Sequence, residues 1–328
     1  MGCGSSSAAP AMNDVILLND QFFRAVKMSA EHLEAWKTNV INCEGASLHE
    51  MVNDVCHGFG FTGLIWACKK HKLDCVQWLL DSGAKVEGTC RNGRTALFFC
   101  RSRDIAQLLL EKYANPNHAD KKGETVLMNS VTNCKVDVVK LLIEYHCNVN
   151  ACDNDGYTAL KNAACGDEEG HVECLRLLLS SGADLTLGSD SVLHLAAQSG
   201  TASTMKILVG CDGCDIEIKD ELQLTPLLVA ATYGRKDNVK VLLEAGADIL
   251  AVNEKGQTAL IIACRGDETF CDGKEDWIGC VQVLLFLTLT LTLPRTRTRT
   301  RTRTRTLTPT PTLTLTPTPT LSLTSRSC

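Results

Sequence analysis

Apolar residues recur along this chain in a pattern typical of short, paired helices. In the stretch 225–258, Thr-Pro precedes the apolar run LLVAA, and Pro226 suits the first turn of a helix because its missing N–H would have no partner there. Gly234 allows a turn, and residues 238–244 then have the apolar spacing of a second helix. Gly246 is placed to end that helix in left-handed geometry. Two short helical faces cannot be buried within one such unit, so neighbouring units must cover both sides.

The same unit returns along most of the chain. Equivalent openings stand at Thr62, Thr95, Thr125, Thr158, Ser191, Thr225 and Thr258, separated by 33, 30, 33, 33, 34 and 33 residues. A glycine lies two residues before most of these openings. A residue suited to a tight turn lies five before four of them, at Asp120, Asp153, Asp220 and Asn253.

This period and these motifs resemble the ankyrin repeat family over about residues 57–285. The resemblance implies an all-α solenoid of stacked helix-turn-helix units, with β-hairpin fingers projecting from one side. We expect a flexible N-terminus in residues 1–13, capping helices in 14–57, repeats in 58–286 and a low-complexity tail in 287–328.

Departures from the repeat identify its least regular places. The spacing over 20–41 predicts a capping helical unit in which Phe22 and Ala25 take the positions of the motif's Leu and Ala. Tyr113 and His146 stand where other copies have the helix-ending glycine, and a bulky residue in left-handed geometry costs about 1 kcal/mol. Asp167, Glu168 and Glu169 form an insertion between the two helices of one copy.

The last copy runs into repetitive sequence. Residues 277–285 predict its second helix, after which Leu-Thr alternation and six Arg-Thr pairs follow. We expect the Thr-Pro parts to be extended and the Leu-Thr part to favour β-structure. A basic tail that binds anionic lipid is the alternative, although no amphipathic face accompanies the charge.

Composition indicates an intracellular, specifically cytoplasmic, protein. Many of the 18 cysteines occupy core positions of the repeats, among them Cys68, Cys75, Cys165, Cys174, Cys264 and Cys280. No secretory signal or membrane span is apparent, which favours a reducing compartment. The net charge is −5, yet the tail carries seven Arg and no acidic residue, so the repeats are more acidic still. An acidic body argues against nucleic-acid binding.

The N-terminus carries a possible membrane anchor. Residues 1–6 match Met-Gly-x-x-x-Ser, which resembles N-myristoylated proteins, with Gly2 as acceptor and Cys3 where a palmitoyl chain is commonly added. One myristoyl chain binds membranes only marginally, so stable attachment at the cytosolic face of a membrane would need both residues.

The sequence contains no convincing catalytic, metal or cofactor site. Cys211 and Cys214 have metal-like spacing but no second ligand pair, and we interpret them as two loop cysteines. His194 matches a histidine that is structural in the family. Neither a phosphate-binding loop nor a dinucleotide fingerprint is present. We therefore expect a protein that is not an enzyme.

The remaining candidate for function is the exposed surface of the repeats, which could bind other proteins. By resemblance, partner proteins would contact finger tips and the helix-turn face, which here comprise Lys69, Lys70, Arg91, Asn92, Arg94, Lys121, Lys122, Asn154, Asp155, Tyr157, Leu222, Leu224, Tyr233, Glu254 and Lys255. The early fingers are basic, which favours a partner with an acidic segment. We expect a non-catalytic adaptor tethered to a membrane. Two alternatives stay open: the recognition part of a larger enzyme or ligase complex, and a chain whose repetitive end is not genuine coding sequence.

Overall fold

The structure is a computed structural model that describes residues 12–41, 47–55, 60–188, 191–199, 201–266 and 274–292. The expected acylation site at Gly2 and Cys3, and the tail beyond Thr292, lie outside these residues. The helices are α1 (Met12–Met28), α2 (Ala30–Ile41), α3 (Leu48–Val52), α4 (Gly63–Lys69), α5 (Leu73–Asp81), η1 (Ala96–Phe99, a 3₁₀ helix), α6 (Arg103–Glu111), α7 (Val126–Thr132), α8 (Val136–Glu144), α9 (Ala159–Cys165), α10 (Glu169–Ser180), α11 (Val192–Gln198), α12 (Ala202–Val209), α13 (Pro226–Thr232), α14 (Lys236–Glu244), α15 (Ala259–Arg265) and α16 (Lys274–Thr292).

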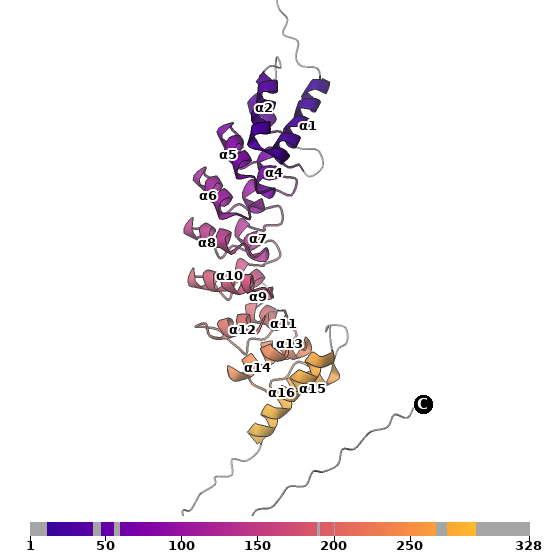
Figure 1. Cartoon of the computed structure of the whole chain (residues 1–328). Helices are drawn as coiled ribbons and strands as arrows, with labels where there is room; N and C mark the ends of the chain where they lie inside the picture. Colours follow the sequence, from indigo (N-terminus) through magenta and orange to yellow (C-terminus); the bar gives the residue numbers. More distant parts are fainter. Residues whose placement is uncertain are drawn as a thin grey trace, which may run out of the picture.

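The helices stack in pairs into one elongated column, which confirms the expected all-α solenoid (Figure 1). The first helices of successive copies lie along one side of the column and the second helices along the other, with α1 and α2 at the N-terminal end. Each pair packs on its neighbours through buried Leu, Val and Ala side chains, so the core is continuous along the column.

The opening threonine ends the loop and begins the first helix of a copy. Thr62, Thr125 and Thr158 each accept a hydrogen bond on the side-chain oxygen from the backbone N–H three residues on, at 3.2–3.3 Å. This N-cap satisfies an N–H that has no partner within the helix. Thr95 opens the shortened copy and has no such cap bond, and the helix after it is the four-residue η1.

The N-terminal cap is the helical unit expected over 20–41, with two differences in its bounds. Helix α1 begins at Met12, and the unit is divided at Ser29 between α1 and α2. Phe22 and Trp36 are buried with ring centroids 4.7 Å apart, and they cover the outer side of the first copy. Gly63 permits this contact, because a Cβ there would lie 2.4 Å from the Phe22 ring.

The C-terminal end differs from expectation. Helix α16 includes the predicted helix over 277–285 but continues to Thr292, through Leu-Thr sequence that we expected to favour β-structure. Cys280 and Leu284 are fully buried and fix the start of this helix. Extension then adds one hydrogen bond per residue, and leucine is a good helix former, so the β preference of threonine is overridden.

The cysteines are mostly buried, with two exceptions to the expectation. Cys68, Cys75, Cys174 and Cys280 are at most 1% exposed, whereas Cys165 is half-buried and Cys264 is exposed. Cys264 belongs to the last copy, and within the described part of the chain no further copy covers α15. Every cysteine in the described part of the chain is a free thiol.

Candidate protein-interaction surface

Four of the fingers are each shaped by one side chain at the base. The Oδ1 atom of Asp120 accepts hydrogen bonds from the backbone N–H groups of Lys122 at 2.8 Å and Glu124 at 3.1 Å. The same pair of bonds, to residues two and four positions on, recurs at Asp153, Asp220 and Asn253. This turn confirms the role expected of the four polar residues, and it fixes the tip without an extended strand.

Neighbouring fingers are joined through their backbones. Lys121 donates its N–H to the carbonyl of Asn92 at 3.1 Å, and Asn154 donates its N–H to the carbonyl of Lys122 at 3.0 Å. Three successive tips therefore have fixed spacing and orientation before any partner arrives. A preordered surface binds with a smaller loss of conformational entropy.

Arg94, one of the expected contact residues, serves a structural purpose. Its guanidinium donates to Asp120 at 2.8 Å and to Glu124, and it lies over the Phe98 ring with the centroid 5.6 Å from Cζ. Burial alone would raise the pKa of Asp120, but hydrogen bonds from Arg94 and the Lys122 N–H outweigh that effect and hold it below its usual value. Arg94 thus links the second copy, which opens at Thr95, to the third copy, which opens at Thr125.

The other expected contact residues divide by exposure. Exposed side chains belong to Lys69, Lys70, Arg91, Asn92, Lys121, Lys122, Asn154, Asp155, Leu222, Glu254 and Lys255, whereas Tyr157, Leu224 and Tyr233 are half-buried. We call the exposed tip residues between Arg91 and Lys255 the finger row. His194 is buried, and its Nε2 lies 2.8 Å from the carbonyl oxygen of Leu224, in agreement with the structural role expected for it.

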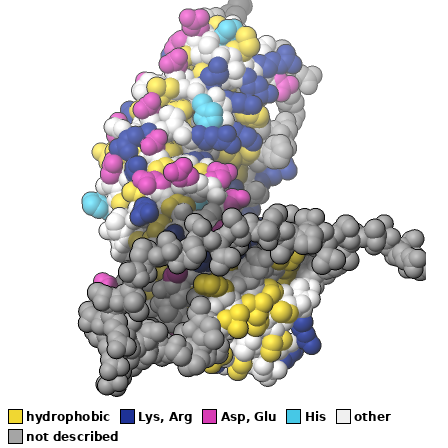
Figure 2. All heavy atoms as spheres, turned by 60° about the horizontal axis from the view of Figure 1, so that its bottom comes forward, with side chains coloured by type: hydrophobic (Ala, Val, Ile, Leu, Met, Phe, Trp, Pro, Cys, Tyr) yellow, Lys and Arg dark blue, Asp and Glu magenta, His cyan; other side chains and the backbone are white. Residues whose placement is uncertain are grey.

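A cluster of lysines and aromatic rings lies beside the first finger. Lys69 Nζ is 4.8 Å from the Phe61 ring centroid, and Lys27 and Lys70 place their Nζ atoms 5.0 and 5.5 Å from the Trp66 centroid. Figure 2 shows Lys and Arg side chains gathered along one flank of the N-terminal part of the column. We call these five residues the Trp66 cluster. It places positive charge beside the half-buried Trp66 ring, and tryptophan is a residue type enriched at protein interfaces.

A groove lies between the last two fingers, and Trp277 is among the residues that line it. It has a volume of about 350 Å³ and brings together four expected contact residues with several others; its lining comprises Leu222, Leu224, Thr232, Asn253, Glu254, Lys255, Gln257, Ile262, Arg265 and Trp277. We call it the Trp277 groove. Its mixture of apolar walls and polar rims is suited to one or two side chains of a peptide.

Trp66 and Trp277 were missed by the sequence reasoning. Trp66 lies four residues after an opening threonine, and Ile262 in the Trp277 groove holds the same position of its copy. This position is occupied by different residue types from copy to copy, including Phe99, Asn129 and Asn162. Variation within an otherwise regular repeat was the available signal.

The thiols near polar groups are not poised for nucleophilic catalysis. Cys134 lies 3.1 Å from His171 Nδ1, but burial and the Glu168 carboxylate raise the pKa of this thiol to about 11. Burial likewise raises the pKa of Cys214 to about 11. A reactive cysteine needs a shift in the opposite direction.

No helix among the residues that the structure describes combines the length and apolar character needed to cross a membrane.

The comparisons agree on one family. The sequence model for ankyrin repeats matches three times, over residues 22–120, 101–189 and 193–273. Mouse ankyrin repeat and SOCS box protein 16 is 34% identical over 103 residues, which are 30% of this chain and 23% of that protein. Mouse protein phosphatase 1 regulatory subunit 12A is 34% identical over 94 residues, 29% of this chain and 8% of that protein. These matches span less than a quarter of either relative.

The fold has a solved counterpart as well. The crystal structure of the human ASB11 ankyrin repeat domain superimposes with a TM-score of 0.58 at 21% identity, and the match covers 69% of this chain and 97% of that domain. At this identity the likeness concerns the fold. Together with the matched segments, which include most of residues 22–273, it completes the assignment: this chain belongs to the ankyrin repeat family.

Proposed function

We propose that this protein is a non-catalytic adaptor whose finger row binds a partner protein. The observation that carries the proposal is the set of backbone bonds that hold three successive exposed tips in fixed register, from Asn92 through Lys121 and Lys122 to Asn154. A rigid, side-chain-rich edge on a long column offers an extended contact area.

The charge of this edge favours a partner with an acidic segment near the N-terminal half. Lys69, Lys70, Arg91, Lys121 and Lys122 are all exposed there. Complementary charge accelerates encounter and selects among partners, and its effect declines with added salt. The Trp277 groove, farther along, would take apolar side chains of the same partner.

Charge reversal tests the proposal directly. Tagged full-length protein should capture a set of partners from cells that is lost with the double variant K121E/K122E. The control K206E/K240E makes the same charge change on the second helices α12 and α14, at exposed lysines away from the tips. Equal capture by both double variants would contradict binding through the finger row.

We further propose attachment to the cytosolic face of a membrane through acyl chains on Gly2 and Cys3. Support comes from the sequence motif alone. Gly2→Ala should abolish membrane association on cell fractionation, and Cys3→Ser should leave protein that exchanges between membrane and cytosol, because one chain binds marginally. Deletion of 295–306 tests the alternative that the Arg-Thr tract binds lipid. If Gly2→Ala fractionates like the wild type, acylation does not anchor the protein.

A second candidate function is the recognition part of a larger enzyme or ligase complex. It is favoured by the last copy, where Ile261, Ile278, Leu285 and Phe286 are exposed at 43–67%, and Figure 2 shows hydrophobic side chains gathered at that end of the column. Transcript sequencing across codons 285–293 decides between the adaptor and the recognition part of a larger complex. A transcript that continues into a further domain would favour the larger complex.

A further inference from the structure

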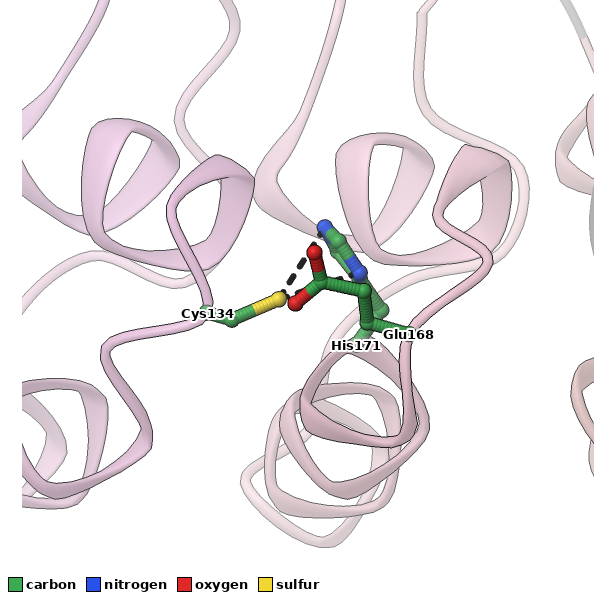
Figure 3. A group of neighbouring side chains, drawn as sticks. All are labelled: Cys134, Glu168 and His171. Carbon is green, nitrogen blue, oxygen red and sulfur yellow. Dashed lines mark hydrogen bonds between the residues drawn. The ribbon is translucent and has the colours of Figure 1, made fainter.

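Three metal-ligating side chains converge at the junction of the third and fourth copies (Figure 3). Cys134 lies in the turn between α7 and α8, Glu168 precedes α10, and His171 lies in the first turn of that helix. Cys134 Sγ is 3.1 Å from His171 Nδ1 and 3.4 Å from Nε2, and the three ligand atoms all lie within 4.8 Å of one another. Thiolate, imidazole and carboxylate are the three ligand types that zinc takes in proteins.

We propose that Cys134, Glu168 and His171 bind a single Zn²⁺ ion that clamps the third copy to the fourth. Tetrahedral zinc with bonds of about 2.3 Å to sulfur and 2.0 Å to nitrogen places those two atoms about 3.5 Å apart. Sγ now lies 3.1 Å from Nδ1 and 3.4 Å from Nε2, so the imidazole has to turn until one nitrogen faces the ion and the other moves away from the sulfur. His171 is buried, Cys134 half-buried and Glu168 exposed, so the ion has a path from solvent and a fourth position open to water.

The chain departs from its own repeat to assemble the cluster. The insertion Asp167–Glu169 delivers Glu168, and the glycines beside it make room. A Cβ at Gly166 would lie 2.0 Å from the His171 ring, and one at Gly170 would lie 2.9 Å from Cys134 Cβ. Cys134 itself has φ +51°, at the turn position that Gly234 holds with φ +62° in the sixth copy. His71 has φ +56° at the same position of its own copy, so this left-handed conformation is a regular feature of the turn.

The charges balance on binding. The thiol releases its proton to solvent, and the resulting thiolate and the Glu168 carboxylate together neutralise Zn²⁺, while His171 binds as neutral imidazole. The Asp167 carboxylate, next to Glu168 in the chain, adds negative charge that favours a bound cation. Proton release makes the affinity rise with pH.

Cobalt and zinc titrations of the full chain test the site. Co²⁺ should produce a thiolate-to-cobalt absorption band at a single equivalent, and Zn²⁺ should bleach that band and raise the thermal midpoint. Cys134→Gly should abolish both effects while the metal-free midpoint stays level or rises, because glycine relieves the positive φ. Loss of a metal ligand would leave the metal-free midpoint level or higher, whereas damage to the fold would lower it.

Matched control variants test whether the signals come from this site and not from metal binding by other cysteines. Cys152→Ser changes an exposed thiol and should keep the band and the shift. Glu168→Gln should weaken zinc binding at least tenfold, whereas Glu169→Gln, the neighbouring exposed carboxylate, should not. Gly166→Ala should displace His171 and weaken binding, whereas Gly210→Ala, at a glycine with ordinary φ, should not. Failure of zinc to shift the wild-type midpoint, or a band that survives Cys134→Gly, would overturn the proposal.

Discussion

Left-handed residues show how individual side chains depart from the repeat. Tyr113 and His146 have φ of +66° and +55°, at helix ends where Gly83, Gly182 and Gly246 stand in other copies. The backbone therefore keeps the glycine geometry even where the sequence gives it a side chain. Stacking of the flanking helices outweighs the local cost of about 1 kcal/mol at each position.

Replacement of Tyr113 by glycine should stabilise the array by about 0.5–1 kcal/mol, through relief of left-handed strain. The ring is 93% exposed, so its removal forfeits almost no packing. His146→Gly should act in the same direction. Urea unfolding measures the effect, with Lys112→Gly as control, since Lys112 has φ −92° and should lose stability. A lower urea midpoint for Tyr113→Gly and His146→Gly would show the geometry to be unstrained.

Buried thiols should make the fold sensitive to alkali. Burial raises the pKa of Cys147 from 9.0 to about 11, so the unfolded chain releases this proton first as pH rises. The contribution of Cys147 is therefore complete below pH 9 and lost as pH rises towards about 11. Lys135 has the opposite effect on stability. Burial lowers its pKa to about 8, so the free-energy cost of burying its charged ammonium group disappears as pH rises above that value.

The comparison of variants isolates the thiol. Cys147→Ala should lose less of its urea midpoint between pH 8 and pH 10.5 than the wild type does, and Cys152→Ala, at an exposed thiol, should behave as the wild type. Parallel losses in all three proteins would mean that Cys147 ionises alike in the folded and unfolded chain.

At the scale of elements, the junctions between copies decide stability. Arg94 joins η1 to the next finger through Asp120, whose side chain is only 3% exposed, and Glu124, at 20%. The ion pair between Arg103 and Glu144 on the outer helices is open to solvent at 39% and 54%. Removing one partner of a buried ion pair lowers the stability of a protein far more than removing one partner of an exposed pair.

Arg94→Met should destabilise the array by about 1–3 kcal/mol, because it leaves a buried carboxylate without its charged donor. Arg103→Met should cost under about 1 kcal/mol. The pKa of Asp120 is depressed from 3.8, so the stabilisation is present above that pH and lost below it. The gap between the Arg94 variant and wild type should accordingly narrow in acid, which urea midpoints at pH 7 and pH 3 would measure. Equal midpoints for the two variants at pH 7 would contradict this role.

How far the elements follow from the sequence depends on what fixes them. Opening threonines, turn-forming aspartates and helix-ending glycines act within a few residues, so the copies and their turns were predictable. Arg94 was not recognised as a link, because its partners lie 26 and 30 residues away. The Leu-Thr sequence was misassigned because packing of Cys280 and Leu284 selects the helix, which local propensity does not reveal. The Cys134 cluster joins residues 37 apart and had no sequence motif.

At the scale of the molecule, the hydrophobic core extends along the column and is built from contacts between adjacent copies. Among the described residues, the main contacts of each pair of helices are with the pairs next to it in the column (Figure 1). Stability in such an array is the sum of copy and junction terms, so a local weakness should stay local. The same property lets the finger row vary from copy to copy without disturbing the core.

Hydrogen exchange should reveal this locality. Arg94→Met weakens the junction of the second and third copies, and amide exchange should accelerate from η1 to α7 while α13 and α14 keep their wild-type protection. Asn238→Ala should do the reverse, because the Asn238 amide donates to the carbonyls of Ala196 at 3.0 Å and Ala197 at 3.4 Å and so joins α14 to α11. If either variant accelerated exchange equally in both regions, the array would unfold as one cooperative unit, and the additive description would fail. Reciprocal, local acceleration is the outcome expected of a column in which each copy is held only by its neighbours.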